Sequence, residues 1–369
     1  MRNTLFFLAI FISIFLVNAC NKEGDDKEDD MVQVIDTLVI NMDSIPFSKL
    51  SSYGFFEGDL KDLEPHEALI PYNLNTALFS NYATKQRFVY VPLGEKVNYQ
   101  SNEQETLEFP EGSIIIKSFY YQNDFTDLAA GKRILETRLL IRKEGEWEAA
   151  EYIWNDDQTE ADYKIAGGQI DVSWIHYDGS TRSTLYSIPN NNECKGCHEL
   201  GSDMVLIGPK ARYLNKDFDY KEGTMNQLEK WETLGVLEGL PDFAEVPKAG
   251  TWGNENESLN DRARAYLDIN CAHCHNAQGP ANNSGLFLDF YQADSSKLGF
   301  CKGPVAAGGG SGNLDYSIAP GDPDASIMIY RLNSLEPDES MPELARSVVH
   351  EEGLQLLRDW ISSIEGECN

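Results

Sequence analysis

Two copies of one short motif carry the chemistry of this sequence. CKGCH at 194–198 and CAHCH at 271–275 both have the form C-x-x-C-H. Two cysteines three positions apart lie on one helical turn, so each can form a thioether with a vinyl group of a haem, and the adjoining histidine supplies an axial nitrogen to the iron. The motifs therefore predict two covalently attached haem c groups. The predicted attachment residues are Cys194 and Cys197 for the first haem and Cys271 and Cys274 for the second, with His198 and His275 as axial ligands.

A zinc site is the alternative interpretation of four cysteines in two C-x-x-C pairs. Structural zinc pairs are usually separated by ~12–20 residues, whereas Cys197 and Cys271 are 74 positions apart. A redox-active dithiol would explain one pair, but it would explain neither the histidines nor the duplication. We therefore prefer haem, and we expect His273 to face solvent rather than to bind a metal.

Each iron also needs a sixth ligand, a water molecule or an open position, and a thioether sulfur at that position favours simple electron transfer. Met341 precedes Pro342 in a loop 66 residues after His275, where a sulfur can reach the iron without breaking a helix. We predict Met341 as the sixth ligand of the second iron. Met328 lies in an apolar helical run and is expected in the core.

The sixth ligand of the first iron is less constrained. Met225 follows His198 by 27 residues and is our first choice, because that length of chain can cross to the other side of the haem. His176 and Met204 are alternatives, as is an open site, although Met204 follows His198 by only six residues. The two remaining histidines, His66 and His350, are expected at the surface or at helix ends.

The N-terminus has the form of an export signal. Residues 1–19 contain Arg2 and an apolar run over 5–17, which is too short to span a bilayer but suits a signal peptide. Ala19 directly before Cys20 resembles a lipobox, so Cys20 is predicted to carry the lipid anchor; an ordinary signal peptide is the alternative. Residues 20–46 are predicted to form an acidic flexible tether. We expect a location in the cell envelope of a Gram-negative bacterium, anchored to the outer membrane and either periplasmic or surface-exposed.

Lipid and haem account for five of the seven cysteines and leave Cys301 and Cys368. In an oxidising compartment such a pair predicts a disulfide. Two separate thiols are the alternative.

Composition excludes several classes of function. The 369 residues contain 30 Lys+Arg and 60 Asp+Glu, a formal net charge of −30, and so strongly acidic a chain gains no counterion release from nucleic acid. With 41% apolar residues the chain is not a disordered protein, and its one long apolar run excludes a polytopic membrane protein. The expected partners are a redox protein and, through the lipid anchor, a membrane.

Two kinds of element must position the motifs. Residues 47–193 are predicted to form an antiparallel, sandwich-like β-rich domain, in which Glu144-Gly145 suits a hairpin turn. From 194 the pattern becomes helical: Ser258 followed by Asp261 is typical of a capping box, and apolar residues at helical spacing end the chain. We therefore predict all-α cytochrome c-type haem domains, with a first haem-binding helical segment at 194–250 and a cytochrome c domain at 251–369. The Gly-rich stretch 303–313 is expected to be a loop around the haem.

Longer segments also carry a family resemblance. The chain resembles bacterial, often lipid-anchored, dihaem c-type cytochromes with a β-rich N-terminal region. The resembling segments are LIPYNLNTALFSNYA (69–83), FPEGSIIIKSFYY (109–121), ETRLLIR (136–142), YIWNDDQTEAD (152–162), IPNNNECKGCH (188–198), IGPKARYLN (207–215), CAHCH (271–275), PGDPDASIMIYRL (320–332) and Met341-Pro342. The resemblance implies haem binding and electron transfer.

The sequence therefore favours a dihaem c-type cytochrome lipoprotein that transfers electrons at the cell envelope over an enzyme. The alternative is a dihaem redox enzyme of the peroxidase type, in which one iron keeps an open position. A third interpretation makes the β-rich domain a module that binds a partner protein or a glycan.

Overall fold

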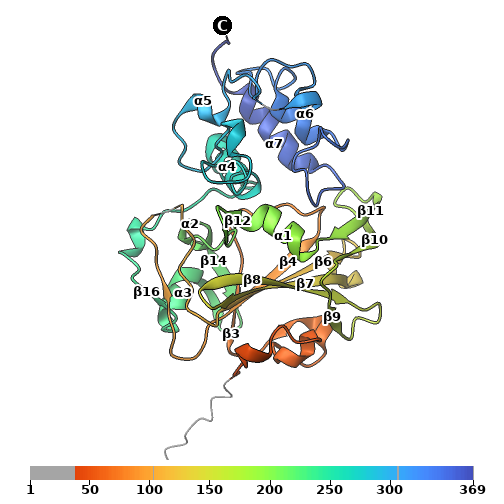
Figure 1. Cartoon of the computed structure of the whole chain (residues 1–369), viewed down its shortest axis with the longest axis vertical. Helices are drawn as coiled ribbons and strands as arrows, with labels where there is room; N and C mark the ends of the chain where they lie inside the picture. The colour runs from red at the N-terminus through yellow and green to blue at the C-terminus, as the bar shows by residue number, and fades with distance from the viewer. Residues whose placement is uncertain (1–37, 103, 306, 369) are drawn as a thin grey trace, which may run out of the picture. The chain divides into compact units, whose positions relative to one another are not determined.

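The core of the fold is a six-stranded antiparallel sheet, seen in a computed structural model that describes residues 38–102, 104–305 and 307–368 (Figure 1). Its strands follow the order β3-β4-β6-β7-β8-β9. They are β3 (Leu69–Tyr72), β4 (Thr84–Tyr90), β6 (Ile114–Gln122), β7 (Lys132–Lys143), β8 (Glu146–Trp154) and β9 (Ala161–Tyr163). Consecutive strands along the chain are neighbours in the sheet, as in a β-meander.

The turn between β7 and β8 is formed by two residues with left-handed backbone conformations. Glu144 and Gly145 both have positive φ angles, 53° and 81°, and Lys143 pairs directly with Glu146. Two such residues in a row form the type I′ turn, whose twist matches that of antiparallel strands. The hairpin predicted at Glu144-Gly145 is confirmed.

Both faces of this sheet are covered. One face packs on the segment that begins near Ile45, with Leu50, Tyr53 and Leu63 almost completely buried against the strands. The other face packs in part on the hairpin of β10 (Gly168–Ile175) and β11 (Thr181–Ile188), where Trp174 meets the sheet. Alternating polar residues of the strands are therefore buried rather than exposed to water.

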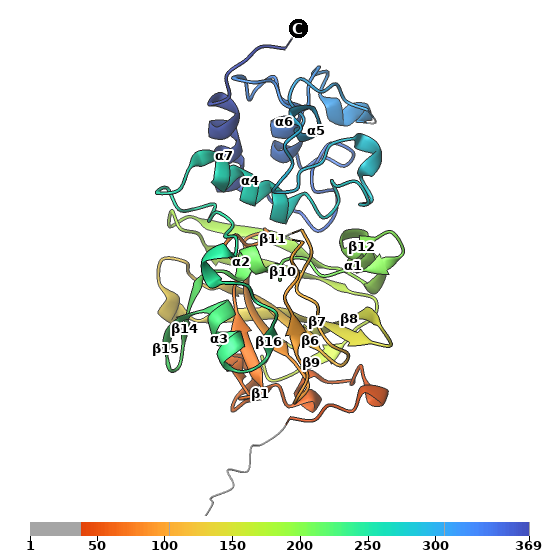
Figure 2. The same cartoon turned by 90° about the vertical axis from the view of Figure 1, so that its left-hand side faces the viewer.

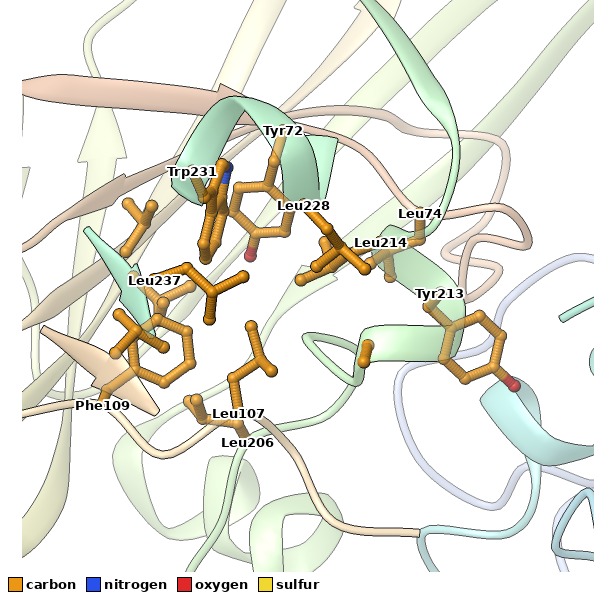
Figure 3. Close-up of a cluster of buried hydrophobic side chains, with 14 of the residues drawn as sticks. Tyr72, Leu74, Leu107, Phe109, Leu206, Tyr213, Leu214, Leu228, Trp231 and Leu237 are labelled. Carbon is orange, nitrogen blue, oxygen red and sulfur yellow. The ribbon is translucent and has the colours of Figure 1, made fainter. Parts of the chain in front are cut away.

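Residues 199–250 complete the second face of the sheet. Their short elements are β12 (Glu199–Leu200), β13 (Asp203–Met204), α2 (Ala211–Leu214), β14 (Asp217–Tyr220), β15 (Gly223–Asn226), α3 (Gln227–Thr233) and β16 (Leu237–Glu238). Figure 2 shows α2, α3 and the strands near them gathered together, and Figure 3 shows the buried cluster that they share with the sheet strands. Trp231 of α3 is fully buried against Tyr72 and Phe109, and β16 pairs in parallel with β5 (Val97–Asn98).

The C-terminal elements form a separate apolar cluster. They are α4 (Leu259–Asn270), α5 (Ser295–Leu298), α6 (Ile327–Asn333) and α7 (Glu351–Ser362). Helix α4 begins where predicted, because the Ser258 side chain accepts a hydrogen bond from the Asp261 N–H. Leu267 of α4, Met328 of α6 and Leu357 of α7 belong to one core, and α4 packs against α7 (Figure 1).

The predicted fold class is wrong. Residues after 193 do not form all-α cytochrome c-type domains: five strands, β12 to β16, lie among them, and their first part packs into the core of the sheet. The described residues between 271 and 326 are mostly loop, with one α-helix of four residues, α5, and two short 3₁₀ helices. The helical pattern is real in α3, α4 and α7, but it does not extend to the Gly- and Asn-rich stretches between them. In the β-rich part the second layer holds only short sheets among the described residues, the hairpin of β10 and β11 and the strand β5, which pairs with β16.

The remaining elements are short. They are β1 (Phe56–Glu57), β2 (Glu64–Pro65), α1 (Asn191–His198) and the 3₁₀ helices η1 (Met42–Ser44), η2 (Leu50–Tyr53), η3 (Leu60–Asp62), η4 (Leu128–Ala130), η5 (Phe243–Glu245), η6 (Asn282–Ser284) and η7 (Gly308–Ser311). The signal peptide predicted at 1–19, the lipidated Cys20 and most of the tether predicted at 20–46 lie outside the described residues. In the part of the chain that is described, no helix has the length and apolar character needed to cross a membrane. The predicted domain boundaries stay predictions.

Candidate haem-binding site

The first C-x-x-C-H motif lies on α1. The Asn190 side chain accepts hydrogen bonds from the Asn192 and Glu193 N–H groups, and the Glu193 carboxylate accepts one from the Asn190 N–H at 2.8 Å, which makes a complete capping box. Positions 194, 197 and 198 are three and four residues apart, so their side chains share one face of this helix. All three line the cavity described below.

A backbone carbonyl fixes the orientation of His198. The β12–β13 hairpin brings the chain back beside α1, so that His198 Nδ1 lies 2.7 Å from the Val205 carbonyl oxygen. Because a carbonyl can only accept, the hydrogen of the ring lies on Nδ1. Burial lowers the pKa of His198 to about 4, so the ring is neutral near pH 7. Its Nε2 therefore carries a free lone pair, which is the state that binds a metal.

The side chain of Ser284 fixes the orientation of His275 in the second motif. Helix α4 leads into Cys271, and a turn closed by the hydrogen bond from the His275 N–H to the Cys271 carbonyl (2.9 Å) places His275. Its Nδ1 lies 3.3 Å from Ser284 Oγ. That hydroxyl donates its hydrogen to the Ala281 carbonyl at 2.7 Å and so accepts from Nδ1. Burial lowers the pKa of His275 to about 4, which again leaves a neutral ring with a free Nε2.

The two motifs meet in space. Cys274 Sγ lies 3.9 Å from the Gly196 carbonyl oxygen, and all four motif cysteines are free thiols. A hydrogen bond from Cys274, with a second from His273, lowers the pKa of Cys197 to about 4 although the thiol is largely buried. His273 was predicted to face solvent, and this is wrong: it lies between the motifs and lines the cavity.

A cavity of about 650 Å³ joins the two motifs. This volume falls in the range of roughly 300–1,000 Å³ that is typical of small-molecule and cofactor sites. Its walls come from the sheet, from the segment that follows α1 and from α4, α6 and the loop before α7. The Gly-rich stretch 303–313 contributes Pro304, Val305 and Ala307 to the wall. The thiols and imidazoles that reach this space are the donor set that haem c attachment requires.

Met341, the predicted sixth ligand of the second iron, reaches the cavity. It lines the cavity, as does His275, and its N–H donates to the Arg331 carbonyl at 3.1 Å, which ties the loop to the end of α6. Met328 belongs to the C-terminal core, as expected, but it also lines the cavity.

The structure does not bring Met225 to the cavity, which corrects the prediction for the first iron. Met225 lies on β15 opposite Phe218, because after the β12–β13 hairpin the chain leaves the motif to cover the sheet. Met204 on β13 and His176 do not line the cavity either. His176 is 3% exposed and accepts a hydrogen bond from Trp174 Nε1 at 3.2 Å.

Of the other two histidines, His350 lies at a helix end as expected and His66 does not lie at the surface. His350 caps the start of α7, a helix end as predicted, but it lines the cavity, with Nδ1 2.9 Å from the Tyr266 hydroxyl and its ring stacked on Phe79 at 4.2 Å. His66 is buried rather than at the surface, and its Nδ1 accepts from the Ala68 N–H at 3.1 Å.

A buried acid–base network forms another wall, and sequence reasoning missed it. Arg138 on β7 lies 2.5 Å from Glu136 and 3.3 Å from Glu151, and the Tyr186 hydroxyl donates to Glu136 at 2.5 Å. Burial raises the pKa of Glu136, but the Arg138 charge outweighs it and the pKa is lowered. Burial and the neighbouring Glu136 raise the pKa of Glu151. The signal in the sequence is a charged residue within an apolar strand.

Cys301 and Cys368 form a disulfide, with their Cα atoms 5.3 Å apart. It joins the segment after α5 to the chain beyond α7.

Among the described residues, no group of three or more His, Cys, Asp and Glu side chains is arranged to hold a metal ion directly. A haem iron takes only one or two ligands from the protein, so its site needs no such group. Comparisons of the chain with models of protein families, with curated proteins and with solved structures found no match.

Proposed function

We propose that this protein is a dihaem c-type cytochrome that transfers electrons at the bacterial cell envelope. One observation carries the proposal: two C-x-x-C-H motifs, far apart in the sequence, open into the same cavity. In each motif the histidine donates from Nδ1 to a fixed acceptor and so presents Nε2 as a ligand. A zinc site is disfavoured, because structural zinc needs four converging ligands and the described part of the chain holds no such cluster.

The haem iron would supply one-electron chemistry, and the residues of the chain would set its potential. Val205 and Ser284 hold the two histidines and make them stronger donors through their hydrogen bonds. Apolar side chains from the sheet and from α4, among them Leu140 and Leu267, line the cavity and would keep water from the haems. Met341 offers a sulfur ligand on the side of the second histidine.

The predicted location and partners complete the proposal. A lipid on Cys20 would hold the protein at the outer membrane, and the acidic chain would meet a redox partner that presents basic groups. The two motifs are close together, with Cys274 Sγ 3.9 Å from the Gly196 carbonyl oxygen. Such proximity favours electron transfer from one haem to the other within the chain.

The proposal is tested by expressing the full chain in a bacterium that attaches haem c to exported proteins. We expect two haems per chain by intact mass and by the pyridine haemochrome spectrum. Cys194→Ala with Cys197→Ala should leave one haem, and so should Cys271→Ala with Cys274→Ala. The matched control is Cys301→Ala with Cys368→Ala, which should keep both haems. A wild-type chain that carries zinc, or no cofactor, would end the proposal.

A second candidate function follows from the first motif. None of Met225, Met204 and His176 lines the cavity, which favours an open position on the first iron and hence a peroxidase-type enzyme. Cyanide separates the two candidates. Binding to one iron, with turnover of peroxide, supports the enzyme, whereas two six-coordinate low-spin irons without a response support electron transfer alone.

A further inference from the structure

Three basic residues lie side by side across the sheet. Arg87 on β4 pairs with Lys117 on β6, and Lys117 pairs with Arg138 on β7. Neighbouring strands are about 4.8 Å apart, so the three residues follow one line across the sheet. We call them the cation row. All three side chains line the cavity.

Such a row is unfavourable by itself. Like charges directly opposite one another on neighbouring strands destabilise a sheet. Arg138 has carboxylate partners in Glu136 and Glu151. Arg87 and Lys117 have none among the described residues: Arg87 donates to the Asn73 side chain at 2.9 Å, and Lys117 Nζ lies 4.8 Å from the centre of the Phe119 ring.

Burial adds to the unfavourable free energy of placing these like charges side by side. Arg87 is only 4% exposed, and a buried charge needs a partner of opposite sign. Burial, together with the charges of Arg87 and Arg138, lowers the pKa of Lys117 to about 7. Yet the chain has twice as many acidic as basic residues, and no carboxylate of the described ranges forms an ion pair with Arg87 or Lys117. Such a wall is suited to an anion supplied by a ligand.

The position of the cation row in the cavity indicates which anion the row would bind. Lys117 lies close enough to Cys197 and His198 to act on both electrostatically. We propose that Arg87 and Lys117 bind the propionate carboxylates of the haem attached at Cys194 and Cys197. Guanidinium and ammonium groups are the usual partners of carboxylates in proteins. This inference rests on the proposed function, because it takes a haem at the first motif as given.

The row then has a consequence for the redox chemistry. Positive charge near an iron stabilises the reduced form, which carries one positive charge less than the oxidised form, and therefore raises the reduction potential. Only the first haem should feel this effect strongly, since the row lies on its side of the cavity.

The test uses the holoprotein and redox titrations of Lys117→Met and Arg87→Met. Each substitution should keep two haems and lower the potential of one of them by an amount equivalent to a tenfold change in the ratio of reduced to oxidised haem, ~59 mV for one electron. Lys143→Met is the matched control, because it removes one positive charge from β7 outside the cavity lining. Lys117→Arg keeps the charge and should keep the wild-type potential.

The outcomes separate the two proposals. A wild-type chain without haem would end the proposed function and this inference with it. Two haems with unchanged potentials in Lys117→Met and Arg87→Met would overturn only the inference. If Lys117→Arg or Lys143→Met lowers the potential as much as Lys117→Met does, the charge at the row is not responsible, and the inference is again overturned.

Discussion

The first C-x-x-C-H motif lies on a short capped helix against the sheet, whereas the second follows the end of α4 in the C-terminal core. His198 donates to a backbone carbonyl, and His275 donates to the hydroxyl of Ser284. Lys117 of the cation row acts electrostatically on Cys197 and His198 of the first motif. Met341 is hydrogen-bonded to Arg331, whose charge acts on His275 of the second motif. The same five-residue motif is thus placed in two environments that differ in charge and in ligand supply.

Under the proposed function, this difference would allow one chain to hold two haems at different potentials. Ligand type, nearby charge and hydrogen bonds to the histidine all tune an iron, and the two motifs differ in each of them. Two unequal sites give electron flow a direction, which two equal sites would not.

Breaking the buried ion pair that joins α2 to α4 should have the largest effect on the stability of the fold. Arg212 on α2 and Asp268 on α4 are 2.5 Å apart and each about 1% exposed. Arg212→Met leaves the Asp268 carboxylate buried without its charge partner, which should lower the free energy of unfolding by about 3–5 kcal/mol. Urea unfolding of the holoprotein measures this change.

A matched exposed ion pair provides the control for that experiment. Arg182 and Glu351 also join the sheet side to the C-terminal core, at 2.8 Å, but both side chains are accessible to water. Arg182→Met should cost at most about 1 kcal/mol. Equal losses in Arg182→Met and Arg212→Met would show that burial of the pair is not what matters.

Removing the disulfide should affect only the second region. Cys301→Ser with Cys368→Ser opens a covalent loop with a sequence separation of 67 residues, which should cost about 2–4 kcal/mol of unfolding free energy. The spectrum of the first haem should not change, because neither cysteine lines the cavity. A wild-type protein whose stability is insensitive to reductant would contradict the expectation.

Met341→Ala should distinguish the two irons. We expect loss of the far-red methionine–iron charge-transfer band and a fall in one potential of more than ~59 mV, a tenfold change in the redox ratio. Met225→Ala is the control and should leave both potentials unchanged, because Met225 lies on β15 away from the cavity. If Met341→Ala has no effect on either spectrum, the assignment of Met341 fails.

Ser284→Ala should have the smallest effect. Without the Ser284 hydroxyl, the His275 ring keeps its backbone hydrogen bond at Leu286 but becomes a weaker donor, so the potential of the second haem should rise, by less than ~59 mV. In the first motif His198 donates to the Val205 carbonyl oxygen. Because Ser284→Ala does not alter that hydrogen bond, the potential of the first haem should stay constant. Redox titration followed at two wavelengths measures both. A shift of the first haem would mean that the two hydrogen bonds are not independent.

Local features of the fold were predictable from the sequence. The turn at Glu144-Gly145, the start of α4 after Ser258 and the amphipathic α7 depend on neighbours within a few residues, so short patterns predict them. The strands β12 to β16 were missed because they are short and owe their form to the sheet that they cover. The pairing of β16 with β5 joins residues 140 positions apart, and no local pattern contains it.

The candidate site also contains residues that could be predicted from the sequence and residues that could not. The motif residues were evident from spacing alone, and the structure brings them to one cavity. The cation row was not evident, since each of its members is a single charge in its own strand and only the register of β4, β6 and β7 aligns them. Met225 was chosen by its distance along the chain, and the path of the chain through β14 and β15 makes that distance irrelevant.

The walls of the cavity come from residues as far apart as Tyr72 and Leu354, which has a consequence for biogenesis. If the chain is exported from its N-terminus as proposed, Cys194 and Cys197 would reach the far side of the membrane while the residues that close the cavity are still being translocated. An enzyme that joins haem to these thiols would then work on a cavity whose last wall has not yet folded. The order of translocation, as well as affinity, would decide whether each chain receives both proposed cofactors.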